Sequence, residues 1–161
     1  MMNRLERIYQ KLSSVNRENP WYGESLESIL SPVTFEEAIF LPEGGDRSIS
    51  HYLTHLIQWR IFCLEKIQEK TQRNIALNSA EDWPLTVPAT EEEWTEIKNQ
   101  YLVLTDKLLE VVFEMEDPQL DETVPEKRYT YAFLLEGVID HDLYHFGQIS
   151  LLKRLAKSLR D

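Results

Sequence analysis

The stretch LLEGVIDHDLYHFGQISLLKRLAKSL, Leu134 to Leu159, combines apolar side chains with two histidines at a helical spacing. Steps of four and three residues connect one stripe, which consists of Leu134, Val138, His141, His145, Gln148, Leu152, Leu155 and Leu159. This period is typical of the inward face of an amphipathic α-helix. We therefore expect one long helix from about Thr130 to about Leu159, with both histidines in its core-facing seam.

The same period predicts three long helices upstream. The first covers roughly residues 2–17, the second begins after Asp46 or Ser48 and runs to about residue 71, and the third follows Thr90. The seam of the first helix is Leu5, Ile8, Leu12 and Val15, and that of the third is Trp94, Ile97, Tyr101, Leu104, Leu108, Val111 and Met115. Four long helices of this kind predict an all-α fold, a four-helix bundle.

The connections between these helices are uneven in length. The first, over residues 20–47, contains TFEEAIF, in which Thr34 and Glu37 have the capping-box spacing that predicts a short extra helix. Thr90 and Glu93 have the same spacing at the start of the third long helix. We find no predicted strand and no repeat, and we expect residues 1–161 to form a single domain.

Composition limits the partners and the compartment. The chain has 17 basic and 28 acidic residues and a formal net charge of −11, which argues against nucleic acid or an anionic membrane as a partner. MMNRLERIYQKL lacks the continuous apolar core of a signal peptide, and no apolar run is long enough to span a membrane. The one cysteine, Cys63, cannot form an internal disulfide, and we expect a cytoplasmic protein.

All four histidines lie in two pairs with a spacing of four, HYLTH (His51 and His55) and HDLYH (His141 and His145). Residues four apart on a helix lie on the same side, about 5–6 Å apart at Cβ. A buried imidazole without a partner costs roughly 1–3 kcal/mol. One metal ion would satisfy both His141 and His145, and this pattern therefore favours a metal site.

A third ligand is available on the second helix. His55 lies on a flank shared with Trp59 and Phe62, away from the polar arc of Ser50, Thr54 and Gln58. His51 lies nearer the polar border, where it is a border residue or a partner of a ligand. Cys63 is about 12 Å along the axis from His55, too far to share its ion, and is interpreted as a core residue.

Two other metal chemistries fit the spacing less well. HDLYH has Asp142 where the zinc-protease pattern HExxH has the glutamate that acts as general base. A di-iron bundle needs Glu-x-x-His on two helices, and Asp142-x-x-His145 is the only near match. A mononuclear three-histidine site fits better.

Three stretches resemble the DinB-like, or YfiT-like, superfamily, whose members are grouped as metalloenzymes: HLIQW on the second helix, DWPLTVPATEEEW before the third, and GVIDHDLYHFGQISLLKR on the fourth. The resemblance covers nearly the whole chain from NPWYG onwards. It implies an up-down-down-up bundle, a homodimer, and one divalent metal ion held by His55, His141 and His145. Zinc and nickel are the first candidates, although imidazole also suits copper and iron.

Two functional hypotheses follow from the residues and the resemblance. The first is a metal-dependent transferase, with a low-molecular-weight thiol as one cosubstrate, or a hydrolase acting on a small molecule through metal-bound water or a thiolate. The second is a bundle that binds a metal or a small ligand without turnover. His51, Asp142 and Gln148 are candidates for residues that orient the ligands.

Overall fold

The computed structural model describes residues 2–18, 20–68 and 73–158. In this part of the chain the long helices are α1 (Arg4–Asn16), α4 (Ile49–Ile67), α5 (Glu91–Glu114) and α6 (Tyr131–Ser158). The shorter ones are α2 (Leu26–Leu30), α3 (Phe35–Ile39) and the 3-10 helix η1 (Asp117–Asp121). The described residues form no β-strand; Thr123 and Thr130 make an isolated antiparallel bridge.

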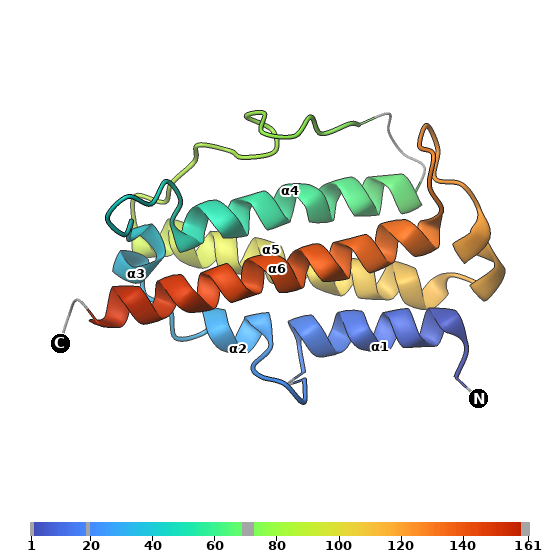
Figure 1. Ribbon diagram of the computed structural model, residues 1–161, viewed down its shortest axis with the longest axis horizontal. Helices are drawn as coiled ribbons and strands as arrows, with labels where there is room; N and C mark the ends of the chain where they lie inside the picture. Colours follow the sequence, from blue (N-terminus) through green and yellow to red (C-terminus); the bar gives the residue numbers. More distant parts are fainter. Residues whose placement is uncertain (1, 19, 69–72, 159–161) are drawn as a thin grey trace.

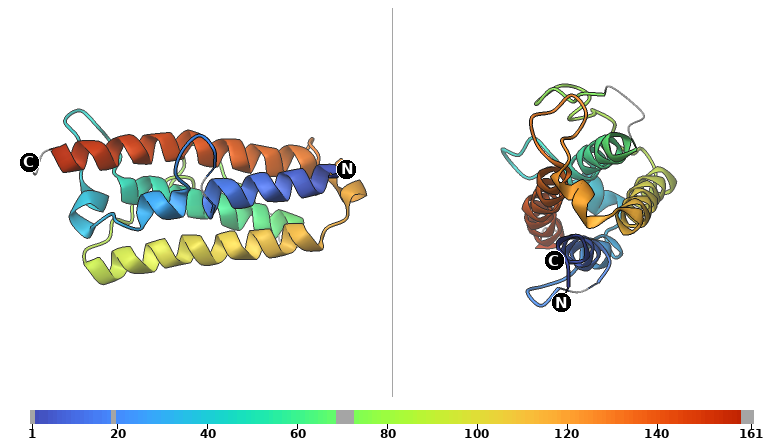
Figure 2. Two further views of the ribbon diagram at one scale, coloured as in Figure 1. Left: turned by 90° about the horizontal axis from the view of Figure 1, so that it is seen from below. Right: turned by 90° about the vertical axis from the view of Figure 1, so that its right-hand side faces the viewer.

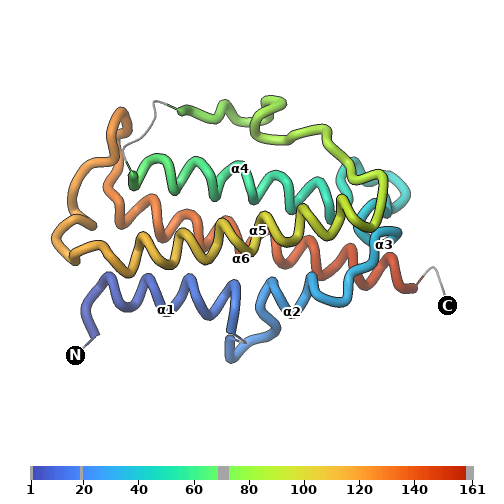
Figure 3. The backbone as a smooth tube through the Cα atoms, turned by 180° about the vertical axis from the view of Figure 1, so that it is seen from behind, coloured from blue at the N-terminus to red at the C-terminus, as the bar shows by residue number. Residues whose placement is uncertain are grey.

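The long helices have the up-down-down-up order. Helices α1 and α6 run in one direction, and α4 and α5 run in the other (Figure 1). Helix α4 packs against α5 and α6, and α1 packs against the same two helices, so that the four surround a common axis (Figure 2, right). Seen from behind, α5 runs between α4 and α1 (Figure 3). The prediction of an all-α four-helix bundle is confirmed.

Local capping explains where the shorter and longer helices begin. The Thr34 side chain accepts a hydrogen bond from the Glu37 N–H, and the expected short helix in the first connection is α3. Helix α2 in the same connection was not predicted; the Ser25 side chain caps it by accepting from the Ser28 N–H. Helix α4 ends at Ile67, and the expected continuation towards residue 71 falls partly on residues 69–72, outside the described residues.

The predicted seam of α6 coincides with the buried face in part, because Leu134, Val138, His145 and Leu152 are buried. The most buried stripe runs through Leu135, Ile139, Asp142, Phe146 and Ile149. His141 and Gln148 are half-buried, Leu155 is exposed, and Leu159 lies outside the described residues. His145 therefore lies within the packed face of α6, and His141 lies at its edge.

Helix α4 has no wide polar arc facing solvent. Ser50 and Thr54 are buried, and the Thr54 hydroxyl donates to the carbonyl oxygens of Ser50 and His51. The connection between α4 and α5 passes over the outer side of α4 (Figure 1), and from it Arg73 donates to Gln58. The connection thus gives Gln58, a polar position that helical periodicity assigns to the surface, a hydrogen-bond partner.

A buried polar network takes one residue from each long helix. Arg60 of α4 donates through Nη2 to the Asp142 carboxylate of α6 at 2.7 Å and to the Tyr101 hydroxyl of α5 at 2.7 Å. The Tyr101 hydroxyl donates to Oδ1 of Asn16 in α1 at 2.6 Å. These four side chains are at most 2% exposed. The network thus connects all four long helices at one level of the bundle through directional hydrogen bonds.

Two predictions about the rest of the molecule can be compared with the structure. Cys63 is fully buried, and burial raises the pKa of its thiol to about 12, as expected for a core residue and not a metal-binding thiolate. No helix within the described ranges has the length and apolar character needed to cross a bilayer.

Candidate metal centre

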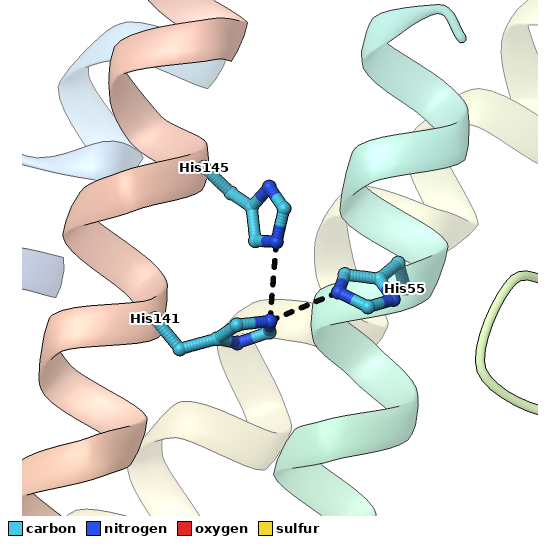
Figure 4. A group of neighbouring side chains, drawn as sticks. All are labelled: His55, His141 and His145. Carbon is cyan, nitrogen blue, oxygen red and sulfur yellow. Dashed lines mark hydrogen bonds between the residues drawn. The ribbon is translucent and has the colours of Figure 1, made fainter. Parts of the chain in front are cut away.

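Three imidazoles from two neighbouring helices converge at the middle of the bundle. His55 comes from α4, and His141 and His145 come from α6 (Figure 4). Nε2 of His141 lies 2.9 Å from Nε2 of His55 and 3.1 Å from Nε2 of His145. Helices α4 and α6 are in contact and run antiparallel, so that residues 86 apart in the sequence meet face to face.

The outer nitrogens of two of these rings determine which tautomer is present. Nδ1–H of His55 donates to the backbone carbonyl of Asp82 at 2.7 Å, and Nδ1–H of His145 donates to Oε1 of Gln148 at 2.5 Å. A neutral imidazole carries one proton, so Nε2 of His55 and Nε2 of His145 are both lone-pair acceptors. At most one proton, on His141, can lie among the three Nε2 atoms when the rings are neutral.

Burial keeps the rings neutral. Burial, together with the neighbouring His145 and His55, lowers the pKa of His141 to about 3. Burial also lowers the pKa of His145 to about 4, although the hydrogen bond that His145 donates to Gln148 opposes this shift. Burial lowers the pKa of His55 as well, despite its hydrogen bonds and charge interaction with Asp82. Neutral imidazoles are the form that binds a metal ion.

The donor set and its spacing fit one divalent ion. Two nitrogens that bind the same ion at about 2.0–2.1 Å are roughly 3 Å apart, close to the 2.9 and 3.1 Å between the Nε2 atoms here. An ion would also satisfy lone pairs that the three rings cannot satisfy among themselves. His55, His141 and His145 are therefore the residues that could hold a metal.

Asp82 and Trp83, in the connection before α5, complete the surroundings of His55. The Asp82 carboxylate lies 3.1 Å from Nδ1 of His55 and accepts from Nε1–H of Trp59 at 2.8 Å. The Trp83 ring stacks on His55 with centroids 3.8 Å apart and planes 7° apart, and the Arg47 guanidinium covers Trp83 at 3.9 Å. Sequence reasoning assigned no role to these residues. The motif DWPLTVPATEEEW, already part of the resemblance, was the available signal.

The three candidate supporting residues lie in different surroundings. Gln148 contacts His145 directly. His51 lies at the start of α4, where its Nδ1 accepts from the Ser48 backbone N–H at 3.2 Å, so that it caps the helix. The Asp142 hydrogen bonds go to Arg60 and to Asn16. Its carboxylate therefore belongs to the buried network and not to the surroundings of an imidazole on α4.

An open cavity of about 600 Å³ leads to the three histidines. Its wall is formed by side chains from α4, the connection before α5, the segment before α6, and α6 itself. Besides the histidines, most of these side chains are aromatic or aliphatic: Trp59, Phe62, Leu77, Trp83, Tyr129, Phe133, Leu134 and Val138. This volume is in the range of small-molecule sites in proteins.

Fold and site together define a helical bundle with a three-histidine group that could bind a metal ion. A comparison with family models matches the DinB superfamily over residues 23–149. The chain therefore belongs to the DinB superfamily, as the resemblance of its motifs predicted. Parallel comparisons with curated proteins and with solved structures gave no match.

Proposed function

We propose that this DinB superfamily protein binds one divalent metal ion through His55, His141 and His145, with zinc or nickel as the first candidates. The observation that carries the proposal is the convergence of three Nε2 atoms at an open cavity. Three neutral imidazoles leave coordination positions for a further ligand, the arrangement of catalytic rather than structural zinc.

The roles of the surrounding residues follow from their contacts. A divalent ion held in this way supplies Lewis acidity and an open coordination position to a bound small molecule. The Asp82 carbonyl and Gln148 hold His55 and His145 in the tautomers that direct Nε2 inward. The Asp82 carboxylate accepts from Trp59 and from the Asn78 N–H at 2.7 Å, and it is thus already committed to positioning.

We infer that the site supports a metal-dependent transferase or hydrolase acting on a small molecule, with a low-molecular-weight thiol as one cosubstrate. The alternative is a bundle that binds a metal or small ligand without turnover. One observation favours the alternative: among the described residues lining the cavity, the single carboxylate is that of Asp82, which is hydrogen-bonded on both oxygens. A reaction here would depend on the ion itself for activation.

Metal analysis tests the site before any activity. Protein purified without a histidine tag and repleted with zinc or nickel is expected to hold about one ion per chain. Substitution of His55, His141 or His145 by alanine should abolish tight binding, and His51→Ala serves as the matched control because its ring caps α4. A stoichiometry near zero in the folded wild-type protein, or loss of the metal in His51→Ala with retention in His55→Ala, would contradict the assignment.

A second experiment separates turnover from binding. The zinc-loaded protein is assayed with 4-nitrophenyl acetate for hydrolysis, and with 1-chloro-2,4-dinitrobenzene plus free cysteine for thiol transfer. The enzyme hypothesis expects a rate in one assay that a chelator removes and that His141→Ala lacks. Bound metal with no acceleration in either assay favours the binding protein.

Two further proposals concern the setting of the molecule. A homodimer is expected from the family and is tested by light scattering of the metal-loaded protein. A cytoplasmic location is expected from the composition and from the single cysteine, and cell fractionation tests it.

A further inference from the structure

We infer that the cavity beside the histidines takes a ligand with a flat, apolar body and a metal-binding head, and that Gly137 makes the room for that body. This inference rests on the proposed metal site and deepens it. The alternative body, a charged one such as a phosphate ester, would need a counter-charge on the cavity wall.

The lining chemistry favours the apolar body. The described residues that line the cavity include no lysine, arginine or glutamate. Both oxygens of the Asp82 carboxylate are already hydrogen-bonded. A charged body would therefore lose water without gaining an ion pair, whereas an aromatic body would replace water against Trp59, Phe62 and Trp83.

Exposed apolar side chains at the cavity support the same conclusion. Phe133 is 64% exposed and Leu77 is 76% exposed, and both line the cavity. Phe133 contacts the Tyr129 ring at 5.3 Å between centroids. A ligand that covers these side chains would remove apolar surface from water, which favours binding.

Gly137 lies one turn before His141 on α6 and lines the same cavity. A Cβ atom built on it meets nothing within 4 Å, so no neighbouring helix requires a glycine here. Glycine inside a helix costs roughly 1 kcal/mol relative to alanine. The position of Gly137 on the cavity wall explains why the helix has a glycine at this point, because any larger side chain would project into the space next to the histidines.

The test compares two hydroxamic acids with the same head and different bodies. Acetohydroxamic acid and 2-naphthohydroxamic acid are titrated calorimetrically into the zinc-loaded protein, and retention of zinc is verified afterwards by mass spectrometry. We expect the naphthyl compound to bind about tenfold or more tightly than the acetyl compound. The preference should disappear for a body that carries a phosphate in place of the second ring.

Two pairs of variants locate the body. Gly137→Leu should lower the affinity for 2-naphthohydroxamic acid at least tenfold, while the affinities for acetohydroxamic acid and for zinc should change less than threefold. Gly147→Leu is the matched control, since Gly147 lies on the same helix with nothing within 4 Å of its Cβ and does not line this cavity. Phe133→Ser should also lower the affinity for the naphthyl compound. Phe113→Ser is its matched control and should leave this affinity unchanged, because Phe113 is 75% exposed and packs on Tyr9.

The outcomes separate the two levels of the proposal. Failure to bind zinc contradicts the proposed function. Zinc binding with equal affinity for both hydroxamates overturns the apolar-body inference alone. A naphthyl preference that survives both Gly137→Leu and Phe133→Ser in folded protein overturns the assignment to this cavity. Equal losses of naphthyl affinity in Gly137→Leu and Gly147→Leu, or in Phe133→Ser and Phe113→Ser, also overturn the assignment to this cavity.

Discussion

Removal of the Asp142 carboxylate should be among the most destabilising single changes in this chain. Asp142 and Arg60 are 2% and 1% exposed, and the carboxylate oxygen lies 2.7 Å from Nη2 of Arg60. In Asp142→Ala the guanidinium stays buried with only the neutral oxygens of Tyr101 and Asn16 as acceptors. Breaking a buried pair in this way costs roughly 3–5 kcal/mol, a fifth or more of the unfolding free energy of about 5–15 kcal/mol of a typical domain.

Urea unfolding followed by circular dichroism at 222 nm measures this cost. With a slope of about 2 kcal/mol per molar urea, the midpoint should fall by roughly 2 M. Asp140→Ala is the matched control, because Asp140 lies on the same helix and pairs with Lys11 at the surface with its side chain 70% exposed. The control should cost less than about 1 kcal/mol.

A double variant tests the cause. Arg60→Met combined with Asp142→Leu removes both charges and should recover most of the lost stability, since no charge remains buried without its partner. The reasoning is refuted if Asp142→Ala costs no more than Asp140→Ala. It is also refuted if the double variant is as unstable as Asp142→Ala alone.

The same variants separate a structural role of Asp142 from a role beside a metal ligand. Because the Asp142 carboxylate bonds to Arg60 and Asn16, zinc affinity of the folded double variant should stay within about threefold of the wild type. A loss of affinity of about 10–100-fold with stability preserved would instead indicate that Asp142 supports an imidazole.

Three further predictions concern the site. Asp82→Ala should lower zinc affinity about 10–100-fold, because the Asp82 side chain anchors the segment whose backbone carbonyl accepts from His55. Competition with a chromophoric chelator measures the affinity, and an unchanged value refutes the prediction. The free energy of unfolding of the metal-free protein should fall by about 2 kcal/mol for each of His141 and His145 between pH 7 and pH 5. The folded pKa values of about 3 and about 4 lie below the unfolded value near 6.5, so protons bind the unfolded chain first. Urea titrations at the two pH values measure this loss, and an unfolding free energy that does not change with pH contradicts it. For the same reason, the rise in melting temperature produced by zinc should persist at pH 5 and begin to shrink only near pH 4, where His145 becomes half-protonated. Disappearance of the rise already at pH 6 would show that the imidazoles are not protected by burial.

The sequence by itself determined the long helices and the placement of His141 and His145 on one side of the last helix. Apolar periodicity located all four long helices, and capping residues such as Thr34 and Thr90 placed the starts of α3 and α5. The spacing of four put His141 and His145 on one side of α6 because an α-helix repeats every 3.6 residues. These features are local, and they follow from residues within a few positions of one another.

The tertiary structure decided everything that depends on distant segments. It brought His55 to His141, and it carried Asp82 over the outer side of α4, where no helical period could place it. It also turned Asp142, and not the histidines, into the centre of the packed face of α6, because Arg60 on another helix supplies the opposite charge. Helical phase limits which side chains share a face, but only packing against a particular neighbour determines which face is buried and what each polar side chain meets there.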